Sequence, residues 1–177
     1  MECILCKTTE NIIKFNGLNI CISCKELSVK ENHRIENIHM HEYVAPTEVL
    51  PNLYIGSINS SVSEEKLRNL RINKIIIAGK FINKYMHEGF EYLELLIDDS
   101  LEQDMSYFFD ISSKFIAENN TGNTLVYCYS GISRSATIVI NYLMKIGMPY
   151  DDAYTLLKSK KNNICPNTNF VNQLKNQ

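Results

Sequence analysis

From residue 50 onward, short runs of apolar and β-branched residues alternate with stretches that carry apolar side chains at helical spacing. The runs that read as strands lie at residues 53–55, 74–78, 92–97 and 124–127. The helical stretches lie at residues 63–70, 104–118, 134–146, 151–160 and 167–174. Few residues typical of β-hairpin turns lie between the predicted strands, and helical stretches connect them instead. Such crossover connections are what parallel strands require. We therefore predict an α/β fold, with a mainly parallel sheet covered by helices on both faces.

The last predicted strand runs directly into Cys128, and a nearly all-apolar helix begins at Arg134. A helix start presents unpaired backbone N–H groups and the positive end of the helix dipole, so it attracts anions. Arg134 can offer a planar, bidentate fork to phosphate oxygens, and the same positive field favours Cys128 as a thiolate. The sequence thus predicts a phosphate-binding loop with a built-in nucleophile; the alternative is a buried structural cysteine beside an unrelated arginine. The expected phosphate-binding residues are Tyr129, Ser130, Gly131, Ile132, Ser133 and Arg134.

The stretch from residue 125 to 144, LVYCYSGISRSATIVINYLM, resembles the dual-specificity phosphatases, a branch of the protein tyrosine phosphatase superfamily. Residues 51–56, 152–160 and 164–174 are similar to the opening strand and the two closing helices of that family, so the resemblance covers about residues 49–174. It implies a protein tyrosine phosphatase-like fold and hydrolysis of phosphotyrosine and phosphoserine/threonine. By resemblance, Cys128 forms a phosphocysteine, Arg134 stabilises the phosphoryl oxygens and Ser135 stabilises the departing thiolate. No cofactor is implied for catalysis.

The leaving oxygen needs a proton, so a general acid must come from elsewhere in the chain. The segment Leu95-Leu-Ile-Asp98-Asp99-Ser100 lies where the family keeps its acid loop, and the register favours Asp99. Asp98 remains the alternative, and Asp104 reads as a helix N-cap. A second interpretation makes Asp98 and Asp99 no more than a solvated turn.

One residue departs from the family pattern. The family has His immediately before the catalytic Cys, whereas this chain has Tyr127. Tyrosine can offer a hydroxyl but cannot become cationic near neutral pH. We therefore expect Cys128 to be less activated than usual, and a phospho-binding pseudophosphatase or an adaptor is the alternative function.

Four of the six cysteines lie near the start of the chain, at Cys3, Cys6, Cys21 and Cys24. Two CxxC pairs separated by 14 residues are typical of a four-cysteine structural zinc site, with a redox role as the alternative. The dipeptide Asn16-Gly17 between the pairs predicts a hairpin turn. We expect a zinc module at residues 1–27, a linker at 28–47 and a phosphatase domain at 48–177. The expected role of the zinc module is to dock a protein partner or substrate, or to close over the phosphatase domain.

Charge and hydropathy limit the partners that we expect. The formal net charge is −2 and the pI is about 6.1, which gives no bulk attraction to nucleic acid or to anionic membranes. The phosphate loop has no lysine, which argues against polyanionic substrates such as phosphoinositides. No secretory signal and no membrane-spanning segment is visible in the sequence. We therefore expect an intracellular, cytoplasmic or nuclear protein that acts on phosphorylated proteins.

Overall fold

A computed structural model describes residues 12–15, 18–21, 42–80, 82, 85–119 and 121–177. The chain divides into two compact units, Met1–His41 and Glu42–Gln177, and each is treated by itself. In the first unit, β1 (Ile12–Phe15) pairs with β2 (Leu18–Cys21) as an antiparallel hairpin. The pairing confirms the hairpin that was predicted around Asn16-Gly17. Of the predicted zinc ligands, Cys21 is the last residue of β2, and Cys3, Cys6 and Cys24 lie outside the described residues.

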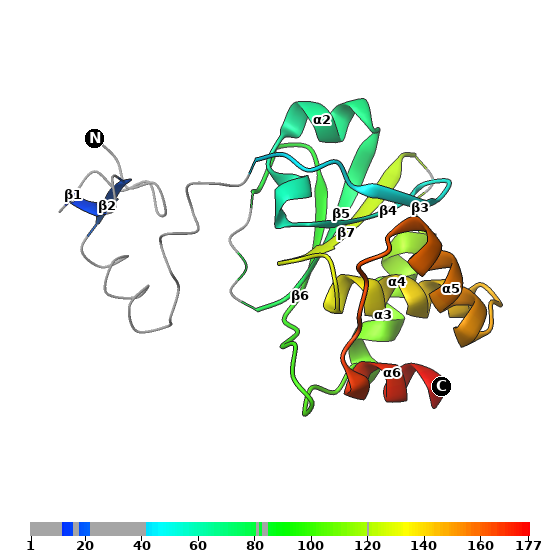
Figure 1. Cartoon of the computed structure of the whole chain (residues 1–177). Helices are drawn as coiled ribbons and strands as arrows, with labels where there is room; N and C mark the ends of the chain where they lie inside the picture. The colour runs from blue at the N-terminus through cyan, green and yellow to red at the C-terminus, as the bar shows by residue number, and fades with distance from the viewer. Residues whose placement is uncertain (1–11, 16–17, 22–41, 81, 83–84, 120) are drawn as a thin grey trace. The chain divides into compact units, whose positions relative to one another are not determined.

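A five-stranded sheet with the order β3-β4-β7-β5-β6 forms the centre of the second unit (Figure 1). Its strands are β3 (Thr47–Leu50), β4 (Leu53–Ser57), β5 (Ile72–Ala78), β6 (Glu91–Leu95) and β7 (Asn123–Cys128). Only the β3–β4 pair is antiparallel, whereas β4–β7, β7–β5 and β5–β6 are parallel. The predicted α/β fold with a mainly parallel sheet is therefore confirmed.

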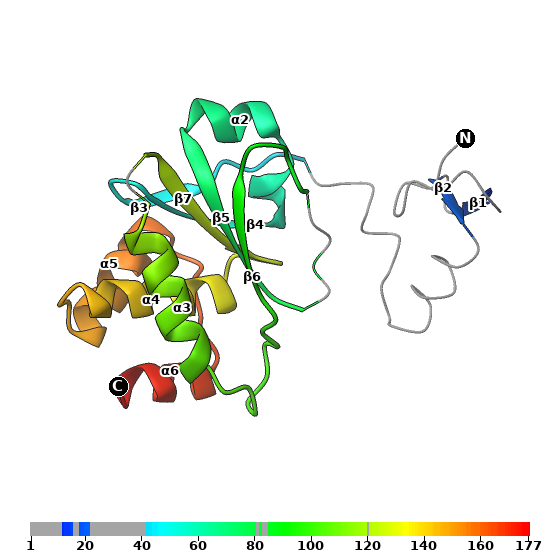
Figure 2. The same cartoon turned by 180° about the vertical axis from the view of Figure 1, so that it is seen from behind.

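Helices cover both faces of this sheet, as Figures 1 and 2 show from opposite sides. One face carries the 3-10 helix η2 (Ile58–Ser61) and α2 (Glu64–Asn69). Ser63 caps α2 by accepting a hydrogen bond from the backbone N of Lys66. The other face carries α3 (Ser106–Ala117), α4 (Arg134–Lys145), α5 (Tyr150–Lys160) and α6 (Thr168–Lys175). Among the helices of the described residues, none has the length and apolarity to cross a membrane.

The burial pattern explains the placement of β5 and α4. Ile75, Ile76 and Ile77 are consecutive and all buried. Consecutive buried residues are typical of a central strand that is covered on both faces. Helix α4 is buried along its first eight residues but one, because it packs on the sheet and contacts α3, α5 and α6 as well. Strands β4 and β7 run parallel and end together, with Ser57 opposite Cys128. The segments that follow these two strands therefore lie at the same carboxyl end of the sheet.

Candidate active site

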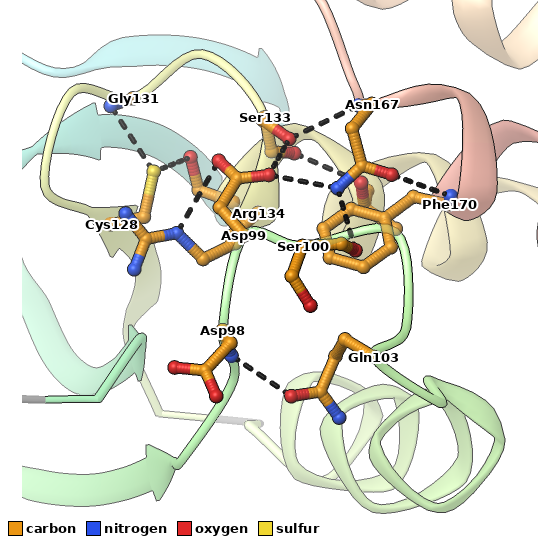
Figure 3. A network of polar contacts seen from close by, with 12 residues as sticks. Asp98, Asp99, Ser100, Gln103, Cys128, Gly131, Ser133, Arg134, Asn167 and Phe170 are labelled. Carbon is orange, nitrogen blue, oxygen red and sulfur yellow. Dashed lines mark hydrogen bonds and ion pairs between the residues drawn. The ribbon is translucent and has the colours of Figure 1, made fainter.

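The segment between β7 and α4 wraps around the sulfur of Cys128 (Figure 3). Cys128 is fully buried at the end of β7. The backbone N–H of Gly131 donates to its Sγ at 3.2 Å, and the hydroxyl of Ser135 lies 3.3 Å from the same sulfur. Both groups can donate a hydrogen bond to a thiolate, and helix α4 begins at Arg134, one residue before Ser135. These contacts favour the charged, nucleophilic form of the cysteine.

Backbone contacts hold this loop from both sides. Gly131 has a φ of 72°, and a Cβ at this position would lie 2.7 Å from the carbonyl oxygen of Gly56 in β4. On the same side, Ile58 N donates to the carbonyl of Tyr129 at 3.3 Å. On the other side, Cys165 N donates to the carbonyl of Ile132 at 2.9 Å. The loop therefore needs glycine at 131 for both its conformation and its close packing.

Arg134 lies over the end of β5, where Gly79 leaves space for its guanidinium. A Cβ on Gly79 would lie 2.5 Å from Nη1 of Arg134 and would also collide with the side chain of Ile82. The Nε of Arg134 is buried and forms no hydrogen bond among the described residues; it faces Oδ2 of Asp99 at 3.6 Å. This separation fits an ion pair but is too long for a hydrogen bond.

The carboxylates of Asp99 and Asp98 point in different directions, and Figure 3 shows that of Asp99 among Ser133, Arg134 and Asn167. Oδ1 of Asp99 accepts hydrogen bonds from Oγ of Ser133 at 2.7 Å and from Nδ2 of Asn167 at 2.9 Å. Asp98 instead forms an ion pair with Lys80 at 2.5 Å. Of the two candidate acids, Asp99 thus lies against the phosphate loop and Asp98 against a lysine that follows β5.

Asp104, the third acidic residue of this region, serves the start of α3. Its Oδ1 accepts a hydrogen bond from the backbone N of Ser106 at 2.8 Å. Hydrogen bonds from the backbone and side chain of Ser106 lower the pKa of Asp104 below its ordinary value. The N-cap position itself is Met105, so Asp104 supports the helix start from one residue further out than predicted.

Tyr127 occupies the position directly before the nucleophile and is fully buried. Burial raises the pKa of Tyr127 well above its ordinary value, and the nearby Ser61 hydroxyl opposes this rise. The Tyr127 hydroxyl nevertheless forms no hydrogen bond of standard geometry among the described residues. The side chain therefore stays neutral at physiological pH, and its hydroxyl lies near the Ser61 hydroxyl of η2.

Lys161, which directly follows α5, adds a positive charge to this site. Partial burial lowers the pKa of Lys161, and the charge of Cys128 opposes that shift, so the two groups interact. Sequence reasoning missed Lys161, Gly79 and the contacts of Asn167. Asn167 stands in the segment 164–174 that resembles the family, but no local pattern showed that its amide reaches Asp99.

No metal centre is present in the part of the chain that the structure describes, where no group of three or more His, Cys, Asp or Glu could hold an ion. This finding does not bear on Cys3, Cys6 and Cys24, which lie outside that part.

The unit that contains this site is similar to known proteins. Residues 53–177 match the model of the dual specificity phosphatase catalytic domain. Human dual specificity protein phosphatase 9 is 41% identical over 134 residues, which are 73% of this chain and 35% of that protein. Human dual specificity protein phosphatase 6 is 39% identical over 134 residues, which are again 73% of this chain and 35% of that protein. The chain thus spans about a third of the length of these curated relatives.

Solved structures extend the similarity to the fold. The structure of the human tyrosine phosphatase-like serine/threonine/tyrosine-interacting protein aligns with a TM-score of 0.69 at 34% identity. It covers 74% of this chain and 93% of that one. The structure of DUSP15 aligns with a TM-score of 0.70 at 30% identity and covers 74% of this chain and 85% of that one.

Proposed function

Because the chain belongs to the dual-specificity phosphatases, we propose that it hydrolyses phosphotyrosine and phosphoserine/threonine in proteins through a phosphocysteine on Cys128. The single observation that carries the proposal is the buried Cys128 sulfur, which receives the Gly131 N–H and faces the Ser135 hydroxyl at the start of α4. A thiolate held in this way is a nucleophile placed inside an anion-binding loop.

In the first step, the Cys128 thiolate attacks phosphorus and the bond from phosphorus to the substrate oxygen breaks. Charge gathers on the phosphoryl oxygens, where the loop N–H groups and Arg134 stabilise it. The leaving oxygen takes a proton from Asp99, whose carboxylate lies beside Ser133 and Arg134. The position of Asp98 on Lys80 supports Asp99 as the acid over its neighbour.

In the second step, water attacks the phosphocysteine and the bond from sulfur to phosphorus breaks. The thiolate returns to its contacts with Gly131 and Ser135, which stabilise it as a leaving group. Asp99, now ionised, accepts a proton from the attacking water. Both steps use side chains of this chain alone, so we expect catalysis without a cofactor.

The substrate class follows from the surroundings of the loop. The loop residues 129–133 carry no lysine, and the charge of Lys161 interacts with that of Cys128. This charge suits one phosphoryl group better than a polyanion. We therefore expect an intracellular phosphoprotein as substrate and no nucleic acid partner.

The direct test is the release of phosphate from para-nitrophenyl phosphate and from peptides with phosphotyrosine or phosphothreonine. We expect activity on all three and its loss in Cys128→Ser, since a hydroxyl near neutral pH is a far weaker nucleophile than a thiolate. Unchanged turnover in Cys128→Ser would sink the proposal.

The role of Asp99 is tested by Asp99→Asn, which keeps the size of the side chain and removes the acidic proton. We expect a loss of about 10²- to 10⁴-fold on phenyl phosphate, whose leaving group needs protonation, and a smaller loss on para-nitrophenyl phosphate. Asp98→Asn is the matched control and should retain most activity on both. Equal losses on the two substrates would exclude Asp99 as the acid.

A phospho-binding pseudophosphatase is the second candidate function. It is favoured by Tyr127, which is neutral, fully buried and near Ser61 in place of the expected His. One similar solved structure is of a protein named tyrosine phosphatase-like. Binding of a phosphotyrosine peptide without any hydrolysis, in wild type and Cys128→Ser alike, would favour this function over the enzyme.

For the first unit we propose a structural zinc ion bound by Cys3, Cys6, Cys21 and Cys24, in a module that docks a protein partner. The β1–β2 hairpin supports the proposal, because it joins the two CxxC pairs. So small a unit gains most of its stability from metal binding. We expect one equivalent of zinc per chain by elemental analysis and its loss in Cys21→Ser; a folded wild type without zinc would exclude the site.

A further inference from the structure

The amide of Asn167 joins two parts of the molecule that lie far apart in the sequence. Asn167 is the N-cap of α6, where its Oδ1 accepts a hydrogen bond from the backbone N of Phe170 at 2.9 Å. Its Nδ2 donates to Oδ1 of Asp99 at 2.9 Å, across 68 residues of sequence. One side chain therefore caps a helix and contacts the proposed general acid at the same time (Figure 3).

The cap decides which end of the amide faces Asp99. An asparagine amide can be turned by 180° with little change in shape, so its orientation follows from its partners. The N–H of Phe170 can only donate, which requires the amide oxygen on that side. The amide nitrogen must then face Asp99, where it can donate but cannot accept.

Ser133 supplies a second donor to the same oxygen. Its hydroxyl donates to Oδ1 of Asp99 at 2.7 Å, while its oxygen accepts the backbone N–H of Asn167 at 3.2 Å. Oδ1 of Asp99 thus receives two hydrogen bonds, and a proton on that oxygen would face the amide hydrogen of Asn167. Oδ2 receives no hydrogen bond among the described residues and faces Nε of Arg134 at 3.6 Å.

We propose that Asn167 and Ser133 are positioning residues that hold Asp99 so that Oδ2, on the side of Arg134, carries and delivers the proton. The proposal rests on the proposed phosphatase function and adds the residues that aim the acid. In the transfer, the O–H bond at Oδ2 breaks, the leaving oxygen of the substrate takes the proton, and the carboxylate that remains is stabilised at Oδ1 by the two donors. The N-cap of α6 is in this way coupled to proton transfer.

The test uses Asn167→Ser, because serine is as good an N-cap as asparagine but has no amide to reach Asp99. We expect turnover of phenyl phosphate to fall about 10-fold, which is the loss of one hydrogen bond to a charged group. Turnover of para-nitrophenyl phosphate, with its better leaving group, should fall less than 3-fold. Asn172→Ser, an exposed asparagine on the same helix, is the matched control and should match wild type on both substrates.

A double-mutant cycle separates positioning from a general structural effect. In an Asp99→Asn background, Asn167→Ser should cause no further loss, since the group through which it acts is gone. Ser133→Ala should behave in the same way. An equal loss on both substrates, or the same loss in the Asp99→Asn background as in wild type, would overturn the proposal.

The proposal also has a readout that does not depend on turnover. The side-chain amide ¹H–¹⁵N signals of Asn167, assigned by their loss in Asn167→Ser, should shift on Asp99→Asn and not on Asp98→Asn. An unchanged signal in Asp99→Asn would overturn the contact itself. A chain that fails to hydrolyse phosphate but shows this shift would refute the phosphatase function and leave the positioning of Asp99 supported.

Discussion

The Tyr127 hydroxyl is a buried polar group that forms no hydrogen bond of standard geometry in the described part of the chain, although the Ser61 hydroxyl lies near it. Leaving such a group unsatisfied costs about 1–3 kcal/mol. We therefore expect Tyr127→Phe, which keeps the ring and removes the oxygen, to raise the free energy of unfolding by about 1 kcal/mol at pH 7. Urea unfolding followed by circular dichroism measures this change. A loss of stability would mean that the hydroxyl has a partner that stabilises the fold.

The same variant should change the pH dependence of stability. Burial raises the pKa of Tyr127 above its ordinary value of 10.0, so above that pH the unfolded chain releases a proton that the folded chain retains. The stability of wild type is therefore full below about pH 10 and falls as the pH rises further. Tyr127→Phe lacks this contribution, so its advantage over wild type should be larger at pH 10.5 than at pH 7.

At the scale of residues, the sequence predicts what is local. Cys128, Gly131, Arg134 and Ser135 fall within eight consecutive residues, so a strand-loop-helix pattern was sufficient to place them together. The two candidates Asp98 and Asp99 could not be separated by register alone, because neighbouring residues in a loop follow no fixed alternation. Their partners, Lys80 and Asn167, come from distant segments that only the folded sheet and α6 bring close.

The end of β5 offers a test of how an element shapes the site. Gly79→Ala would place a methyl group 2.5 Å from Nη1 of Arg134, and the guanidinium is the far end of a flexible side chain that can move away. We expect a fall in kcat/KM for para-nitrophenyl phosphate of about 10-fold or more, because small displacements of positioning groups are costly. The melting temperature should also fall, because the same methyl group collides with the buried side chain of Ile82. Unaltered kinetics would show that Arg134 does not depend on this glycine.

Helix α6 is held to the core by Phe170, which is fully buried. Phe170→Ala should lower the free energy of unfolding by about 3–5 kcal/mol through lost burial and the cavity left behind. Chemical unfolding in guanidinium measures this loss. Asn172→Ala, at an exposed position of the same helix, should change stability by less than about 0.5 kcal/mol. A small effect of Phe170→Ala would mean that α6 is not anchored by this ring.

The elements themselves were largely predictable, with exceptions that have physical reasons. The start of α2 is marked in the sequence by Ser63 and by the acidic residues of its first turn, and α4 is marked by an apolar run that ends before Gly147. Strand β3 was missed because residues 47–50 are few and lie at the edge, where only β4 pairs with them. The four-residue helix η2 was missed for the same lack of length, since one turn leaves no periodic pattern.

At the scale of the whole molecule, the unit Glu42–Gln177 contains the sheet, the helices and every residue of the candidate active site. We expect a fragment of residues 42–177 to unfold cooperatively and to keep the kcat/KM of the full chain on para-nitrophenyl phosphate within about 3-fold. Calorimetry and steady-state kinetics on the two proteins test this. A folded but inactive fragment would show that the first unit contributes to catalysis.

The parallel register of β4 and β7, with Ser57 opposite Cys128, also limits how this protein can evolve. Side chains alternate between the two faces of a strand, so deletion of one residue within β7 would turn Cys128 to the opposite face of the sheet. A second deletion could restore the face but would pull the loop one pleat away from Gly56. Insertions and deletions in descendants of this gene should therefore accumulate at the other end of these strands, in the turns that precede β4 and β7.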